Sequence, residues 1–168
     1  SFGQAVFIGI GGYVVGIGSH YAFANGTMWL THGVFQLVLV LVLSVIASLF
    51  IGIVSLRTKG IYFLMITLAI GQMFYLAAVG AYQYGGDDGM TVFVNSRFFG
   101  QSLTGHLTLY VVSAIYLVGC VILVARLSLS RFGLVLRAAK INEDRALAMG
   151  YDAFRVRLVA FVIAGVMA

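Results

Sequence analysis

The feature that most constrains the fold of this chain is the placement of its charged residues. The first 56 residues contain no Lys, Arg, Asp or Glu, whereas residues 126–157 hold seven of the ten basic residues and three of the five acidic ones. Long stretches without charge leave no polar face for water, and charge gathered in one loop gives that loop a separate role. The pattern indicates a polytopic membrane protein with a structured polar segment.

Composition excludes a water-soluble domain. Hydrophobic residues make up 62% of the chain and charged residues 9%, whereas soluble domains carry roughly 25% charged residues. The net charge of +5 does not indicate a nucleic-acid partner, because the cations flank apolar runs as they do in integral membrane proteins. The single cysteine, Cys120, lies inside an apolar run and cannot form a disulfide within one chain.

We predict an all-α transmembrane bundle of about five spans or part-spans, forming one domain over residues 1–168. The expected segments are 33–56, 61–82, 106–125 and 153–168, preceded by the glycine-rich segment 4–23, which is either a packed span or a partly re-entrant helix. The apolar run 158–168 would extend only ~16 Å, against ~30 Å of hydrocarbon. We therefore expect the chain to be an internal piece of a longer protein.

Loop charges predict the orientation of the bundle. If residues 126–157 are cytoplasmic, alternation of the spans also puts Arg57 and Lys59 inside, so nine of the ten cations are cytoplasmic and Arg97 is outside. The opposite orientation would place nine cations outside, against the bias of membrane proteins. Two exterior loops follow, one around residues 20–32 and one around residues 82–101.

The predicted spans contain no charged side chain. Ion-coupled carriers and proton pumps usually hold an ionisable group at membrane depth, so we expect the driving energy to come from outside this piece. The neutral polar side chains in the spans either satisfy helix contacts or, for one or two of them, line a pathway. They are Gln36, Ser44, Ser48, Ser55, Thr67, Gln72 and Ser113.

Several motifs suggest chemistry at first sight but have simpler explanations. The run GIGGYVVGIG lacks the spacing of a phosphate-binding loop, and its Gly9, Gly12 and Gly16 lie at helical spacing that favours close helix packing over ligand contact. The histidines 20, 32 and 106 share no metal-ligand spacing, so no metal site is expected. Asp87 and Asp88 in GGDDG predict a solvated exterior turn, with docking or substrate entry as the alternative. Gln4 and Gln72 are further candidates for a substrate path.

The polar segment itself predicts a short, well-defined helix. Asn142 can cap it, and Glu143 and Asp144 in its first turn suit a positive helix end. Gly150 is suited to end it, and Asp152 can cap the following span. This helix, within a loop over 127–152, is either an ordinary interfacial helix or a lever by which a partner moves the attached span.

Four motifs in this chain resemble the permease subunits of bacterial ABC importers for branched-chain amino acids. The segment AAKINEDRALAMGYDAFRVRLVAFVIAG resembles their conserved cytoplasmic loop. The segment SFGQAVFIGIGGY is similar to their first helix, LRTKGIYFLMITLAIGQMF to their tight turn and following span, and YGGDDGMT to their exterior loop. The four segments occur in family order and cover nearly the whole chain.

Import permeases of this kind carry a coupling loop with the pattern Glu-Ala-Ala, three residues, Gly. In this chain Gly150 takes the glycine, Ala146 the second alanine, Arg145 the first alanine and Asp144 the glutamate. The acid is shorter and one alanine is replaced, so this motif is weaker than the other three. The resemblance implies that residues 142–150 form a coupling helix seated in a groove of an ATPase.

The resemblance implies a transport permease of the inner membrane rather than an enzyme. It would work with a second permease subunit, two cytosolic ATPase subunits and an exterior substrate-binding protein. This chain would bind no cofactor, since ATP and Mg²⁺ would lie on the partner subunits. The expected substrates are leucine, isoleucine and valine, with urea, short amides or a simple sugar as alternatives. A polytopic enzyme or respiratory subunit would need ionisable or metal-binding residues at membrane depth, and none is visible.

Overall fold

The computed structural model describes residues 3–25, 33–58, 60–82, 85, 86, 89, 97, 98, 101, 102 and 106–168. The described chain is helical, as the composition predicts. A hairpin of two-residue strands, β1 (Arg97–Phe98) and β2 (Gln101–Ser102), pairs Arg97 with Ser102. The helices are α1 (Gln4–Asn25), α2 (Gly33–Ser55), α3 (Ile61–Gly80), α4 (His106–Leu129), α5 (Arg131–Ile141), α6 (Glu143–Ala148) and α7 (Ala153–Met167).

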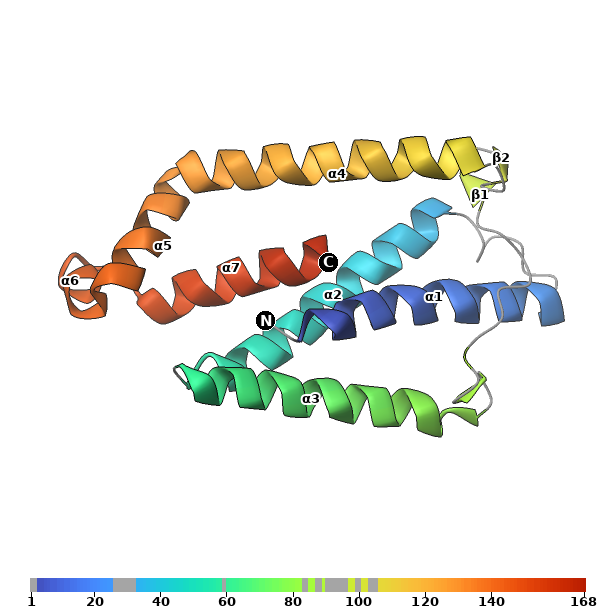
Figure 1. Ribbon diagram of the computed structural model, residues 1–168, viewed down its shortest axis with the longest axis horizontal. Helices are drawn as coiled ribbons and strands as arrows, with labels where there is room; N and C mark the ends of the chain where they lie inside the picture. Colours follow the sequence, from blue (N-terminus) through green and yellow to red (C-terminus); the bar gives the residue numbers. More distant parts are fainter. Residues whose placement is uncertain are drawn as a thin grey trace.

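Successive long helices run in alternating directions (Figure 1). The turn between α2 and α3 lies at the same end of the bundle as α5 and α6, and the β1–β2 hairpin lies at the other end. Arg57 and residues 126–157 therefore share one side of the molecule, as the charge pattern requires.

Three helices in the described part of the chain are long and apolar enough to cross a membrane. They are α2, α3 and residues Leu107–Leu129 of α4, so the chain is a membrane protein. The glycine-rich first segment is one unbroken helix of 22 residues, and whether it spans the membrane stays a prediction. The last segment, α7, has 15 residues and ends between its neighbours near the middle of the bundle.

The centre of the bundle is α2, which contacts α1, α3 and α7. Its buried face is made of small or polar residues with one larger side chain, Ile51, which packs with Val6 and Phe7 of α1. Small residues let helix backbones approach closely in lipid, which explains why this face, and not a leucine-rich one, is buried. The buried residues of α2 are Gly33, Gln36, Ser44, Ser48, Ile51, Gly52 and Ser55.

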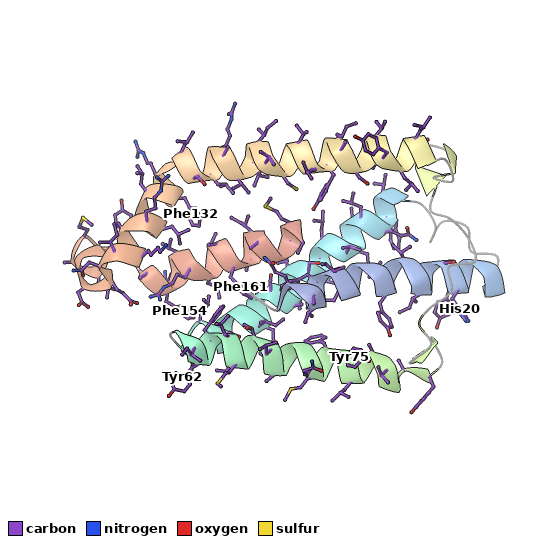
Figure 2. The ribbon with its side chains drawn as sticks, in the orientation of Figure 1. His20, Tyr62, Tyr75, Phe132, Phe154 and Phe161 are labelled. Atoms are coloured by element: carbon purple, nitrogen blue, oxygen red, sulfur yellow. The ribbon has the colours of Figure 1, made fainter. Side chains whose placement is uncertain are left out.

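One aromatic ring of α7 joins the four packed helices. The ring of Phe161 lies edge-on to Phe7 of α1 and to Phe63 of α3, with ring centroids 6.3 Å apart in both pairs. A Cβ atom added to Gly52 of α2 would lie 3.2 Å from the same ring. Figure 2 shows Phe161 on the side of α7 that faces α1 and α2. The hydrophobic contact therefore depends on the absence of a side chain at position 52.

The turn from α2 to α3 is short because glycine permits its geometry. The hydroxyl of Thr58 donates to the carbonyl of Ser55 at 2.8 Å and so satisfies the end of α2. Gly60 then precedes α3 with φ of 65°, a left-handed conformation that favours glycine. The Arg-x-x-Gly-Ile-Tyr-Phe segment thus forms the tight turn that the sequence predicts.

The helix α4 lies apart from this centre, beyond α7 in Figure 1. It continues four residues past the predicted end at residue 125, to Leu129, and no residue of its most apolar 18-residue window is buried. The phenol of Tyr116 donates a hydrogen bond to the carbonyl of Met167 at 2.9 Å, which connects α4 to the end of α7. The chain then turns into α5 at Ser130.

Candidate functional site

The polar segment folds into an elbow of α5 and α6 between the ends of α4 and α7 (Figure 1). Sequence reasoning missed α5, because it treated residues 127–141 as loop. A signal was present: Ser130 precedes a basic, apolar run, and its Oγ accepts from the amide of Gly133 at 3.4 Å as an N-cap. A Cβ on Gly133 would lie 2.5 Å from the carbonyl oxygens of Leu127 and Ser128, so this corner requires glycine.

The predicted short helix is present, and its ends are those the sequence indicated. Asn142 has extended backbone that closes α5, and its carbonyl accepts from the amide of Ala146 at 3.3 Å to begin α6. Gly150 has φ of 84° and donates to the carbonyl of Leu147 at 2.9 Å. The amide of Tyr151 donates to the carbonyl of Ala146 at 3.0 Å. These two bonds form a Schellman motif with Gly150 as its left-handed residue.

Three alanines hold the elbow together. Ala139 of α5, Ala146 of α6 and Ala153 of α7 form a buried cluster, and they are 8%, 1% and 2% exposed. Methyl groups at these positions let three short helices meet closely, and a larger side chain at any of them would separate two helices. Ala146, at the second alanine of the Glu-Ala-Ala pattern, is the member of this cluster that lies in α6.

Charged side chains strengthen the connection of α6 with α7. Glu143 of α6 forms an ion pair with Arg157 of α7, and both are about one-third exposed. The Nε of Arg157 also donates to the carbonyl of Ala153 at 3.2 Å. Asp152 caps α7, as predicted, by accepting from the amides of Phe154 at 3.0 Å and Arg155 at 3.4 Å. The start of α7 and the start of α6 are thus tied to each other.

The outer face of α6 is partly apolar. Leu147 of α6 is 54% exposed and Asp144 is also exposed, while Met149, which directly follows the helix, is 63% exposed. The side chain of Arg145 lies outside the described set. This face stands at the end of the bundle, beyond the spans, and has the mixture of apolar and charged groups that protein interfaces use.

The other predicted site residues lie elsewhere. Gln4 begins α1 and Gln72 lies in α3, both exposed. A Cβ on Gly71 would be 3.9 Å from the side chain of Val6, so the two glutamines lie at similar levels of neighbouring helices. Asp87 and Asp88 fall outside the described residues, although the described glycines of that turn, at positions 85, 86 and 89, have the predicted positive φ.

The glycines of α1 differ from one another. A Cβ at Gly9 or Gly12 would meet no described atom within 4 Å, whereas Gly16 is buried. Their packing role stays a prediction. Close approach is seen instead at Gly165 of α7, where a Cβ would lie 2.9 Å from the Phe7 ring and 3.0 Å from Ser48 Cβ. The sequence carried no GxxxG signal at this position.

The histidines do not come together in the described structure. His20 is exposed near the end of α1, His32 falls outside the described residues, and His106 begins α4 without a described side chain. No group of three His, Cys, Asp or Glu side chains able to hold a metal ion is present among the described residues.

Hydroxyls in the bundle bond mainly within their own helices. Ser48 donates to the carbonyl of Val45 at 2.9 Å and Thr67 to that of Leu64 at 3.0 Å. Ser55 is fully buried, and its Oγ has no hydrogen-bond partner among the described residues. All three side chains are small enough to be buried, and the bonds of Ser48 and Thr67 to helix carbonyls satisfy their hydroxyls there.

The comparison with protein families decides what kind of molecule this is. The family model for the permease component of branched-chain amino acid transport systems matches residues 1–168. The chain belongs to this family. No curated protein and no solved structure gives a significant match. This permease component is thus a transport protein rather than an enzyme, and it works with other transport components.

In this permease component α6 lies at the end of the bundle, and the buried alanines and the Glu143–Arg157 pair connect it to α7.

Proposed function

We propose that this permease is the membrane subunit of an ATP-driven importer in the bacterial inner membrane. In this proposal residues 126–157 are cytoplasmic, and α6 sits in a groove of a cytosolic ATPase subunit. A second permease subunit, a second ATPase and an exterior substrate-binding protein complete the importer. The observation that carries the proposal is α6 itself, which lies at the end of the bundle with Leu147 exposed and is held there by contacts with α7.

The contacts of α7 support a role in passing movement from α6 to the bundle centre. At its start, α7 contacts α6 through Ala153 and Arg157. One to three turns later, Leu158, Phe161 and Gly165 pack against α2. A displacement of α6 by a partner would therefore reach α2 through one continuous helix, without passing through α4.

The chemistry of the spans supports an energy source outside this chain. The helices α2 and α3 carry no charged side chain, so they offer no ionisable group for coupling to a proton or sodium gradient. ATP and Mg²⁺ on the partner subunits would supply the energy. Closure of the ATPases would shift the equilibrium between two conformations of the bundle. A substrate cavity between the helices would then open alternately to each side of the membrane.

Branched-chain amino acids are the substrates that this proposal favours. A path between helices with neutral side chains suits the apolar side chains of leucine, isoleucine and valine. Gln4 and Gln72 are the candidates to meet the polar end of a substrate, and Asp87 and Asp88 are candidates for docking the binding protein. Urea, short amides or a simple sugar remain the second candidate, because neutral polar groups would also suit them.

A charge on α6 tests the coupling. The full-length permease with its partner subunits is reconstituted in liposomes, and ATP-dependent uptake of labelled leucine is measured for Leu147→Glu. We expect uptake and ATPase co-purification to be lost together, because a carboxylate on this exposed face would not enter an apolar groove. Leu129→Glu is the matched control, since Leu129 is also exposed near this end but lies on α4.

Three further outcomes separate the parts of the proposal. Normal uptake and ATPase association in Leu147→Glu would exclude α6 as the coupling helix. If urea or a sugar enters the wild-type liposomes and leucine does not, the coupling stands and the substrate is wrong. A bulky substitution of Gly150 should weaken coupling less than Leu147→Glu, because a Cβ there meets no described atom and strains only the backbone.

A further inference from the structure

We infer that the corner between α4, α5 and α7 is a binding site for an anionic phospholipid. The site consists of a basic cavity beside the elbow and an apolar cavity that runs from it along α7. This inference does not depend on the ATPase partners proposed above. It depends on the two cavities, on the basic residues that line the first and on the apolar residues that line the second along α7.

The outer cavity suits a phosphate headgroup. It has a volume of about 510 Å³, and its lining includes Arg137 and Lys140 of α5 and Arg157 of α7. The acid in this lining is Glu143, which pairs with Arg157, so the lining keeps a net positive charge. Arg137 donates to the carbonyl of Ser128, which holds its guanidinium at the corner of α4 and α5. Arginine and lysine groups arranged in this way bind phosphate oxygens.

The inner cavity suits an acyl chain. It has a volume of about 270 Å³ and lies among Leu127 of α4, Phe132 of α5, and Ile163 and Met167 of α7. Figure 2 shows Phe132 on α5, next to the end of α4. The small residues Ala160 and Ala164 line the same space and leave room beside α7.

The two cavities are adjacent, one with a basic lining and the other with an apolar lining. Leu136 and Arg137 line both, so the basic part lies next to the apolar part. The apolar lining follows α7 from residue 160 to residue 167, which is the direction from the elbow toward the middle of the bundle. A phospholipid in the leaflet at this end would place its headgroup in the basic cavity and its acyl chains in the apolar cavity.

The apolar part decides between a lipid and a free phosphate. A soluble anion would use the basic cavity alone and would gain nothing from Phe132 and Ile163. A lipid would use both, and basic pockets between membrane helices are known to hold anionic headgroups. Within the described residues the apolar window of α4 has no buried residue, and a bound lipid would fill the cavity that α4, α5 and α7 line.

Lipid binding is measured by native mass spectrometry on the full-length protein released from nanodiscs of phosphatidylglycerol or phosphatidylcholine. We expect the wild type to retain phosphatidylglycerol in preference to phosphatidylcholine. The double variant Arg137→Gln/Lys140→Gln should lower phosphatidylglycerol affinity by about tenfold or more, because each basic group near the surface contributes to anionic lipid attraction. The variant Ala164→Phe should reduce retention of both lipids by filling the apolar cavity.

The control removes the same amount of charge nearby. Arg126→Gln/Arg131→Gln changes two exposed cations on α4 and α5 that line neither cavity. Equal loss of phosphatidylglycerol in both double variants would mean diffuse attraction and would overturn the site. Displacement of the lipid by millimolar inorganic phosphate, or no effect of Ala164→Phe, would overturn the lipid as the ligand.

Discussion

Two helices of nearly equal length and similar polarity differ in burial in this permease: α2 lies at the centre of the bundle, and α4 lies at its edge. The helix α2 has 23 residues and α4 has 24, and both are apolar enough to cross a membrane. Within their most apolar windows 22% of α2 is buried and none of α4, so hydropathy did not decide their packing. The difference lies in residue size: α2 has Ser44, Ser48 and Gly52 on one face.

Residue size decides the packing because the solvent around these helices is lipid. Lipid tails are as apolar as leucine, so an apolar helix gains little by leaving lipid for a neighbouring helix. Close backbone approach gains van der Waals contact instead, and it requires small residues on both sides. Gly165 of α7 lies against Ser48 of α2, and Gly52 of α2 lies against Leu158 and Phe161 of α7, so each helix has a glycine at the contact. Hydropathy thus selects which helices enter the membrane, and residue size selects which of them pack.

The largest expected effect comes from closing this contact. In Gly165→Leu even the Cβ would lie 2.9 Å from the Phe7 ring, so α7 must move away from α1 and α2. We expect a loss of about 1–3 kcal/mol in stability from overpacking and a loss of transport. The loss of stability is measured as a lower thermal unfolding temperature of the purified full-length protein, monitored by size-exclusion chromatography.

The same substitution on α4 is the control. A Cβ at Gly119 meets no described atom within 4 Å, so Gly119→Leu should leave the unfolding temperature almost unchanged. Equal destabilisation by the two variants would mean that α4 is packed as tightly as α2, and the contrast between the helices would be lost.

A smaller effect is expected where α4 contacts α7. Tyr116→Phe removes the hydrogen bond to the carbonyl of Met167 and should cost about 0.5–1.5 kcal/mol. We expect spin labels on α4 and α7 to show a broader distance distribution in this variant. Tyr110→Phe, at another exposed tyrosine of α4, should leave the distribution unchanged. A broadening that is equal in both would show that this hydrogen bond does not hold α4.

The smallest effect is expected at the end of α2. Ser55→Ala removes a buried hydroxyl without a described partner, so stability should stay equal or rise by up to about 1 kcal/mol. Ser113→Ala on α4 is the matched change at an exposed position. Reduced uptake in Ser55→Ala at unchanged stability would favour the alternative that this hydroxyl lines a pathway.

Local signals in the sequence predicted the spans and the ends of α6. Uncharged runs indicated α2, α3 and α4, since the bilayer excludes charge. Asn142, Gly150 and Asp152 were correctly placed at helix ends, because capping and left-handed geometry depend on a few neighbouring residues. These features need no knowledge of distant contacts.

Features that depend on distant contacts could not be predicted. The roles of Gly52 and Gly165 arise from side chains on α7, α1 and α2, and a single glycine in an apolar run does not reveal its partner. Helix α5 was missed although Ser130 is an N-cap, because the basic residues that follow were interpreted as loop. The isolation of α4 was also unexpected, since its hydropathy resembles that of α2.

The packing of α7 on α2 has a consequence for the order of assembly during synthesis. Gly165 follows Gly52 by more than a hundred residues, which takes on the order of ten seconds at about 5–20 residues per second. During that interval Ser48 and Gly52 have α1 beside them but not yet α7. The small-residue face of α2 must therefore stay in lipid or against a chaperone until α7 arrives, and a pause in translation after α4 would prolong this exposure.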